Sequence, residues 1–245
     1  MSPVFFWREQ AGPVEWAITD RADGVSEQPF GSLNLGGHVG DDPEAVEQNR
    51  HRLAGSLGRR RDELVFMNQC HGAEVAVVDG PWQAGAAAPA VDGVVTTAPG
   101  LALAVLVADC TPVLLADPAT GVIGAVHAGR PGMTTGIIDR AVATMRDVGA
   151  RDIRAVVGPS VCGRCYEVPE EMSLAAAEVS PESRAVSWSG TPAVDVAAGV
   201  VAQLRANSVA VQWVPGCTRE SDRLYSYRRD GQTGRFAGVV QLASA

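Results

Sequence analysis

Short apolar runs, rich in valine and alanine and bounded by Gly, Pro or Asp-Pro, recur through the middle of the chain. Runs of this length and composition predict β-strands. Strands are expected at Glu63–Met67, Glu74–Val78, Gly93–Thr97, Ala102–Val107, Val113–Ala116, Val122–Val126, Ile153–Val157, Val209–Trp213 and Phe236–Leu242.

Helical patterns are fewer. Asp41-Asp42-Pro43 places a capping residue and a first-turn proline at the start of one helix. Successive strands interrupted by occasional helices predict an α+β sandwich, in which helices flank a mixed sheet, as a single domain over residues 1–245. The loop expected at Ala84–Ala90 is the one low-complexity stretch. The expected helices are Pro43–Leu57, Met133–Val148, Pro169–Val179 and Val194–Ala206.

Composition and net charge exclude several classes of partner and of catalytic chemistry. A hydrophobic content of 46% suits a well-filled core, and a net charge of −8 argues against nucleic acid or an anionic membrane as partner. All 20 basic residues are arginine, which excludes Schiff-base and P-loop lysines. Charge at Arg8 and Glu9 comes too early for a secretory segment, and the longest apolar run, Leu101–Ala108, is too short to span a membrane. A cytoplasmic location is expected, with the cysteines as thiols, ligands or nucleophiles.

Three candidate metal ligands lie at or beside the ends of apolar runs. They are His71 in Gln69–Gly72, Cys110 in Ala108–Pro112, and His127 before Ala128-Gly129. Two imidazoles and one thiolate would leave a fourth position open, which is the catalytic pattern for zinc. The alternative is that all three are ordinary buried residues, since free cysteine is commonly buried.

The other cysteines are harder to interpret. Cys162-Gly163-Arg164-Cys165 is a CxxC motif, which fits a redox pair, half of a structural zinc site, or two loop cysteines. The loop interpretation is favoured because there is no second CxxC. Cys217 is expected to be structural. Cys70 and His71 are neighbours, so only one of them should face a site.

Two further segments could bind substrate. The Gly-rich stretch from Ser32 to Asp42, which includes Asn34 and His38, could bring backbone donors to a ligand or could be a turn before a helix. Five arginines cluster near Leu224–Tyr227 in an otherwise acidic chain, which fits either an anion pocket or a solvated loop. These are Arg219, Arg223, Arg228, Arg229 and Arg235.

Taken in order, these motifs resemble the YfiH/YlmD-type laccase-domain proteins, a multicopper-polyphenol-oxidase-like family now regarded as metal-containing purine nucleoside phosphorylases. The matching pieces span nearly the whole chain. They are Ser32–Asp42 with Asn49-Arg50, Gln69–Gly72, Ala108–Pro112, His127–Gly129, Gly158-Pro159 with Cys165–Val168, and Tyr225–Gly231 with Thr233–Arg235.

The resemblance implies an α/β sandwich in which His71, Cys110 and His127 bind zinc, with copper as the alternative. It implies phosphorolysis of adenosine, inosine, guanosine and methylthioadenosine, with adenosine deaminase as a side activity. The substrates would then be a purine nucleoside and phosphate. Cys110 and Asp109 are the expected catalytic residues, Asp109 as an orienter or proton carrier. By analogy, the expected substrate-binding residues are Asn34, His38, Arg50, Arg228 and Arg229.

Two departures from the family pattern stand out. The family usually continues His-Ala-Gly with Trp-Arg-Gly, whereas this chain has Arg130-Pro131-Gly132. The cysteine pair that usually precedes Tyr-Glu-Val is Arg164-Cys165 here. In the first change the arginine moves by one position, to Arg130, so its role in substrate binding is in question.

Other activities remain open from the residues alone. The same site could hydrolyse an amide in a cell-wall precursor, through zinc or with Cys110 as nucleophile and His127 as base. A non-catalytic metal-binding protein is a further alternative. Polyphenol oxidation by several coppers is disfavoured because the chain has only four histidines.

Overall fold

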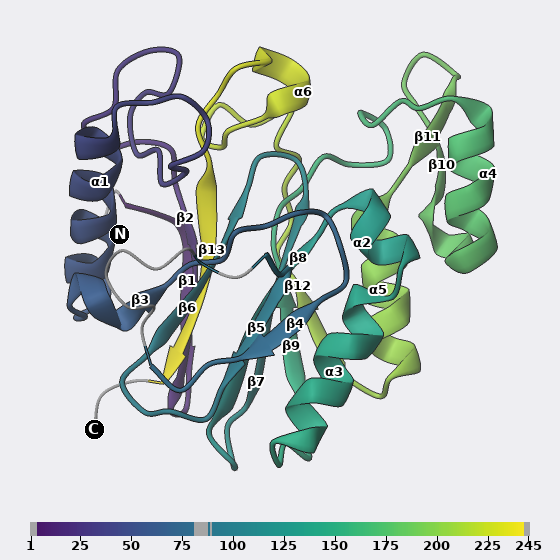
Figure 1. The fold of residues 1–245 in the computed structure, drawn as a ribbon. Coiled ribbons are helices and arrows are strands. Elements are labelled where there is room, and N and C mark those ends of the chain that lie inside the picture. Colours follow the sequence, from purple (N-terminus) through teal and green to yellow (C-terminus); the bar gives the residue numbers. More distant parts are fainter. Residues whose placement is uncertain (1–3, 81–87, 89, 243–245) are drawn as a thin grey trace.

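The computed structural model describes residues 4–80, 88 and 90–242. Its strands form two large mixed sheets that face each other, and helices cover their outer faces (Figure 1). The predicted α+β sandwich is confirmed, with its strands divided between two sheets. Among the described residues, none of the helices has the length and apolar character needed to cross a membrane.

The first sheet has the strand order β1–β2–β13–β6–β3. Neighbouring strands run antiparallel, except that β3 runs parallel to β6. The strands are β1 (Phe5–Ala11), β2 (Val14–Thr19), β3 (Leu64–Val65), β6 (Ala102–Val107) and β13 (Phe236–Leu242).

The second sheet has the order β12–β9–β7–β8–β5–β4, antiparallel in the middle and parallel at both edges. A small third sheet pairs β10 (Arg184–Val186) with β11 (Pro192–Val194). The strands of the second sheet are β4 (Val75–Val77), β5 (Gly93–Thr96), β7 (Thr111–Asp117), β8 (Val122–Ala128), β9 (Arg154–Val157) and β12 (Ala210–Trp213).

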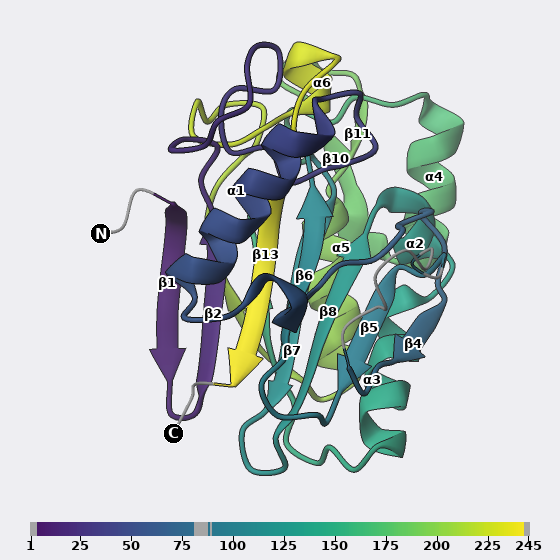
Figure 2. The same cartoon turned by 60° about the vertical axis from the view of Figure 1, so that its left-hand side comes forward.

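Helices cover both outer faces of this sandwich. Helix α1 (Pro43–Ser56) crosses the first sheet (Figure 2), and α3 (Ile137–Asp147) and α5 (Val196–Ala206) cover the second. The Asp42 carboxylate caps α1 by accepting the N–H of Glu44 at 3.1 Å. The shorter elements are α2 (Arg130–Thr134), α4 (Glu170–Val179), α6 (Tyr227–Asp230) and two 3-10 turns, Arg61–Glu63 and Pro181–Ser183.

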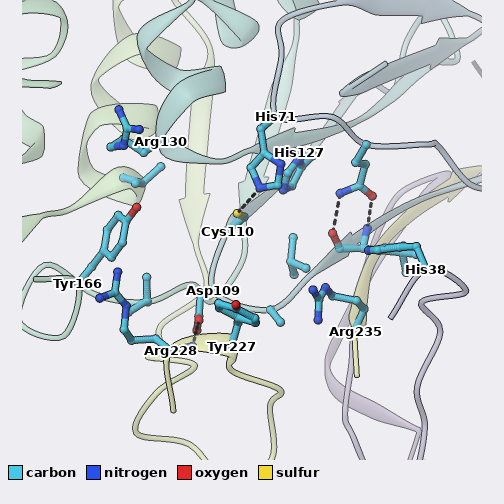
Figure 3. A pocket seen from close by; sticks show the side chains of 16 residues that line it. His38, His71, Asp109, Cys110, His127, Arg130, Tyr166, Tyr227, Arg228 and Arg235 are labelled. Atoms are coloured by element: carbon cyan, nitrogen blue, oxygen red, sulfur yellow. Dashed lines mark hydrogen bonds between the residues drawn. The ribbon is translucent and has the colours of Figure 1, made fainter. Parts of the chain in front are cut away.

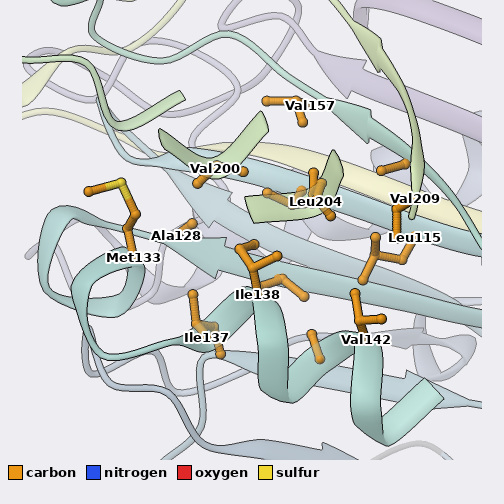
Figure 4. Packing of buried hydrophobic residues seen from close by; sticks show 14 of the residues in the cluster. Leu115, Ala128, Met133, Ile137, Ile138, Val142, Val157, Val200, Leu204 and Val209 are labelled. Atoms are coloured by element: carbon orange, nitrogen blue, oxygen red, sulfur yellow. The ribbon is translucent and has the colours of Figure 1, made fainter. Parts of the chain in front are cut away.

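Three buried clusters fill the spaces between these four layers. Leu53 of α1 packs on the first sheet, and Leu103 of that sheet meets Leu114 of the second between the sheets. On the far side, Leu115 packs against Ile138 of α3 and neighbouring residues of α5 (Figure 4). Leu114 and Leu115 point to opposite faces of β7, which explains why this strand is buried on both faces and apolar along its middle.

The structure corrects the predicted elements in several places. Strands β10 and β11 and the short helix α6 were not predicted. Strands β1 and β2 were not predicted, although β2 is buried along its whole length. The single helix expected at Met133–Val148 is wrong, because Gly136 with a φ of 87° separates α2 from α3. Most of the loop expected at Ala84–Ala90 lies outside the described residues.

Candidate metal and substrate site

The three predicted metal ligands meet at one end of the sandwich. His71 lies in the connection from β3 to β4, and Cys110 ends the connection from β6 to β7, so both belong to segments that pass from one sheet to the other. His127 projects from β8. Their ligand atoms all lie within 4.8 Å of one another. Figure 3 shows the three side chains pointing toward one another.

The geometry of this triad fits a zinc-type ion. Cys110 Sγ lies 3.6 Å from His71 Nε2, close to the separation of about 3.5 Å between S and N ligands of tetrahedral zinc. The His71 and His127 rings stand nearly perpendicular, with their centroids 4.7 Å apart. Two imidazoles and a thiolate therefore converge with room for a further ligand on the pocket side.

Asp92, which precedes β5, organises two of these ligands. Its Oδ1 atom lies 2.8 Å from His127 Nδ1 and accepts the backbone N–H of His71 at 2.9 Å. Its Oδ2 atom accepts the N–H of Gly72 at 2.6 Å and the Cys70 thiol at 3.1 Å. A carboxylate on Nδ1 leaves Nε2 of His127 free for a metal, which is the usual outer-shell arrangement of zinc sites.

The charges of this group favour the ionised form of Cys110. Burial alone would raise the pKa of Cys110, but its interactions with His127 and His71 outweigh burial and lower the pKa to about 6. Burial would lower the pKa of His127, yet Cys110 and Asp92 raise it to about 9. Cys110 is therefore a thiolate near neutral pH, the form that binds metals.

Backbone geometry also concentrates here. His71 and Asp109 both adopt left-handed conformations, with φ of 62° and 94°, which non-glycine residues seldom do. Gly129 packs against the ligands so closely that a Cβ atom there would lie 2.8 Å from His71 Cδ2 and 3.2 Å from Cys110 Sγ. The small residue after His127-Ala128 is thus a steric requirement of the triad.

A pocket of about 420 Å³ opens on the triad, a volume within the range of small-molecule sites. Its lining combines apolar side chains with two tyrosines and three arginines. Gln69 holds the end of β6 in place through two hydrogen bonds to the backbone of Leu106, at 2.7 and 2.9 Å. The lining residues are His38, Gln69, His71, Leu106, Val107, Ala108, Asp109, Cys110, His127, Arg130, Val161, Tyr166, Val196, Tyr227, Arg228 and Arg235.

Three guanidinium groups, from Arg130, Arg228 and Arg235, surround this pocket (Figure 3). None of them forms an ion pair within the part of the chain that the structure describes. Arg228 stacks on the ring of Tyr166, 4.9 Å from its centroid. Arginines that are positioned but unpaired are suited to a phosphate or carboxylate ligand.

His38 and Asp109 occupy the same pocket with different constraints. Burial, together with the charges of Arg235 and Arg50, lowers the pKa of His38. Both oxygens of Asp109 are engaged: Oδ1 accepts the Thr218 hydroxyl and Oδ2 accepts the N–H of Arg228, each at 2.6 Å. Asp109 therefore ties the loop that contains Arg228 to the strand-end turn beside Cys110.

The other expected substrate residues lie behind the pocket wall. Asn34 is buried, and its Oδ1 accepts the N–H of Arg235 at 2.8 Å. Arg50 donates to Leu35 O at 3.0 Å and stacks on Phe66. Arg229 donates to several carbonyl oxygens, including Leu224 O at 2.9 Å. None of the three is among the described residues that line the pocket.

Comparison with known proteins agrees with this fold. The sequence matches the family described as multi-copper polyphenol oxidoreductase laccase over residues 15–243. The chain belongs to this family.

Similar members and structures cover almost the whole chain. It is 57% identical to the purine nucleoside phosphorylase ORF3 of Streptomyces griseus, over 94% of this chain and 95% of that protein. It is 49% identical to a purine nucleoside phosphorylase of Mycobacterium tuberculosis, over 94% and 92%. The crystal structure of YlmD from Geobacillus stearothermophilus has a TM-score of 0.86 and 31% identity, over 99% and 100%.

In this laccase family member, the shifted arginine still reaches the pocket. Arg130 begins α2 directly after Gly129 and lines the cavity together with Tyr166 (Figure 3). Pro131 follows within the first turn of α2, where a proline lacks only an N–H that has no helical partner. The Arg130-Pro131 sequence therefore retains a guanidinium at this wall.

Sequence reasoning missed Asp92, left the substrate role of Arg130 in question and did not assign Tyr166 or Tyr227 to a pocket. Asp92 follows a valine and precedes a strand, a common position for a turn residue. Its role comes from the pairing of β5 with β8, which places Gly93 opposite Val126 and thereby Asp92 beside His127. A single sequence does not reveal that register.

Proposed function

We propose that the chain is a metal-dependent purine nucleoside phosphorylase that acts on adenosine, inosine, guanosine and methylthioadenosine, with adenosine deaminase as a side activity. The observation that carries this proposal is the pocket of about 420 Å³, which a His-Cys-His triad lines together with three arginines that form no ion pair with any described residue. Relatives named purine nucleoside phosphorylase, at up to 57% identity, support the same activity.

In phosphorolysis, a phosphate oxygen bonds to C1′ of the ribose while the bond from C1′ to the purine N9 breaks. The electron pair goes to the purine, which takes up a proton and leaves as the free base, and ribose 1-phosphate remains. Arg130, Arg228 and Arg235 are positioned to bind the phosphate and offset its charge. Tyr166 and Tyr227 offer aromatic faces to the base.

His38 suits recognition of a neutral group. Because burial, Arg235 and Arg50 lower its pKa, the ring is uncharged near neutral pH and offers one N–H donor and one acceptor nitrogen. Asn34, Arg50 and Arg229 are proposed to act on substrate indirectly, by fixing the loops that present Arg235, His38 and Arg228. Asp109 is proposed as a positioning residue for the Arg228 loop.

His71, Cys110 and His127 would hold zinc, with copper as the alternative, and Asp92 would orient His127 and His71. When bound, such an ion supplies Lewis acidity beside the substrate. In the deaminase side reaction, water adds to C6 of adenosine and ammonia leaves, so inosine forms without phosphate.

The test is product analysis by liquid chromatography after incubation of zinc-loaded protein with adenosine, with and without phosphate. Adenine that appears only with phosphate supports phosphorolysis, and inosine in either buffer supports deamination. Cys110→Ala is expected to lose turnover and the metal ion of the His71-Cys110-His127 triad. An alanine variant that keeps full activity without metal at the triad would refute the metal-dependent mechanism.

A second candidate is a cysteine hydrolase that acts on an amide of a cell-wall precursor. The observation in its favour is Cys110, whose pKa of about 6 makes it a nucleophile beside His71. Such an enzyme would survive removal of metal by a chelator and would be inactivated by thiol alkylation. Tight metal binding without turnover of either substrate class would instead indicate a non-catalytic metal-binding protein.

A further inference from the structure

Three of the four remaining cysteines gather at a second place, where they share no residue with the pocket lining. The ligand atoms of Cys162, Cys165, Cys217 and Glu220 all lie within 4.8 Å of one another. Cys165 is buried, Cys162 and Cys217 are half-buried, and Glu220 is exposed. We infer that these four side chains form a structural metal site for zinc or a similar thiophilic divalent ion.

The local backbone presents the ligands as two facing turns. Cys162 and Cys165 lie in a tight turn closed by the hydrogen bond from Cys165 N–H to Cys162 O, at 2.9 Å. Cys217 and Glu220 have the same spacing and lie in a turn closed by Glu220 N–H to Cys217 O, at 3.2 Å. Two ligand pairs of this spacing are the usual way in which a structural zinc site is built.

The two turns are aligned with each other by backbone pairing. Ser160 and Cys217 form a parallel bridge, and Thr218 N–H donates to Ser160 O at 3.1 Å. Cys162 N–H in turn points at Cys217 Sγ, 3.5 Å away. The ligands therefore converge because main-chain contacts hold the two segments in register.

Ligand geometry and the surrounding groups suit a tetrahedral ion. Cys165 Sγ lies 3.5 Å from Glu220 Oε1, near the separation of about 3.6 Å expected between S and O ligands of zinc. The indole N–H of Trp188 donates to the same Oε1 at 3.3 Å, as an outer-shell group that orients the carboxylate. A disulfide between two of the thiols would not explain why the third thiol and Glu220 converge on the same point.

The charge balance is also favourable. Three thiolates and one carboxylate around a divalent ion carry a net negative charge. Arg164 and Arg219 border this cluster: Arg164 stacks on Trp188, 5.2 Å from its ring, and Arg219 donates to Cys165 O at 3.3 Å. Both are placed to offset that charge.

An ion here would act on the pocket by joining two loops that form its wall. The CxxC turn lies between Val161 and Tyr166, which both line the pocket. Thr218, next to Cys217, holds the Asp109 carboxylate. The second site therefore positions the substrate wall and takes no part in bond breaking.

Metal content in the Cys110→Ala background tests this inference, because that variant lacks the thiolate of the first site. After reconstitution with cobalt under reducing conditions, a thiolate-to-cobalt charge-transfer band is expected to persist. Adding Cys217→Ser should remove the band and about one ion per chain. Glu178→Gln, which alters an exposed carboxylate of α4, should change neither.

Glu220→Gln covers the case in which the serine variant fails to fold, because Glu220 is exposed. In the same Cys110→Ala background, this change is expected to weaken zinc binding by about tenfold or more while circular dichroism stays unchanged. Absence of the cobalt band in Cys110→Ala would overturn the inference. So would a loss of two hydrogen masses, reversed by reductant, in place of bound metal, since that result would indicate a redox disulfide.

Discussion

Asp92 Oδ1 lies 2.8 Å from His127 Nδ1 and also accepts the backbone N–H of His71. One buried carboxylate thus fixes the orientation of one proposed metal ligand and the left-handed backbone of another. Burial alone would raise the pKa of Asp92, but its hydrogen bonds with His127, Cys70 and Gly72 outweigh burial and hold the pKa below its ordinary value.

Asp92→Asn is therefore expected to weaken metal binding at the triad by about 10- to 100-fold, the usual effect of losing an outer-shell carboxylate. Zinc affinity measured by competition with a chromophoric chelator checks this. Asp152→Asn, which changes an exposed carboxylate, is the control. An unchanged affinity in Asp92→Asn would mean that the His127 contact does not support the metal.

Gly129→Ala is expected to disrupt the triad, because the new Cβ would lie 2.8 Å from His71 Cδ2. Metal content and turnover should both fall. Gly55→Ala is a matched control, since a Cβ at Gly55 in α1 meets no other atom within 4 Å. Alanine is favoured over glycine in a helix by about 1 kcal/mol, so that variant should be at least as stable as the parent. Equal metal content in both variants would contradict the steric requirement.

Arg130→Ala and Arg228→Ala are each expected to raise the KM for phosphate by about 10- to 100-fold, the cost of losing a charge-assisted hydrogen bond. The KM for the nucleoside should change less. Initial rates at varied phosphate and fixed inosine measure this difference. Arg205→Ala, on the exposed face of α5, controls for the loss of charge. A uniform effect on both substrates would place the phosphate elsewhere.

Asp117 gives a pH-dependent prediction away from the site. Burial would raise its pKa, but the N–H groups of Arg151, Asp152 and Ala119 lower it to about 2. Because the folded pKa is depressed, the stabilisation is fully present above the ordinary value of 3.8 and is lost as the pH falls through about 2.

Asp117→Asn should therefore lower the free energy of unfolding by about 2 kcal/mol at neutral pH. The difference from the parent should shrink as the pH approaches 2. Urea unfolding at neutral pH and near pH 2 measures this difference in the free energy of unfolding. Asp147→Asn, on the exposed face of α3, is the control. A difference that does not vary with pH would show that ionisation of Asp117 is not responsible.

The sequence predicted most strands because their apolar runs are sharply bounded, and β6 and β13 match their expected limits. It missed β1, whose second half carries Arg8, Glu9 and Gln10 on an edge of the sheet. It joined α2 and α3 because the helical spacing of apolar residues continues past Gly136. The left-handed backbone conformation of Gly136 ends the helix there.

In the site, too, some features could be predicted from the sequence and others could not. His71, Cys110 and His127 could be selected from residue chemistry and strand ends, and the structure brings them together. The clustering of Cys217 with the CxxC motif could not be predicted, since Cys165 and Cys217 lie 52 positions apart in the sequence. Only the pairing of Ser160 with Cys217 makes them neighbours.

The proposed metal ligands and part of the pocket wall belong to different parts of the fold, and this has a consequence for how related proteins can change their substrates. The proposed metal ligands sit on strand β8 and on two crossings between sheets whose ends are fixed by the packed layers. Arg228 and Tyr166 come from surface segments outside those layers. Insertions or substitutions in these segments would change the substrate preference. The geometry of the His71-Cys110-His127 triad would stay the same.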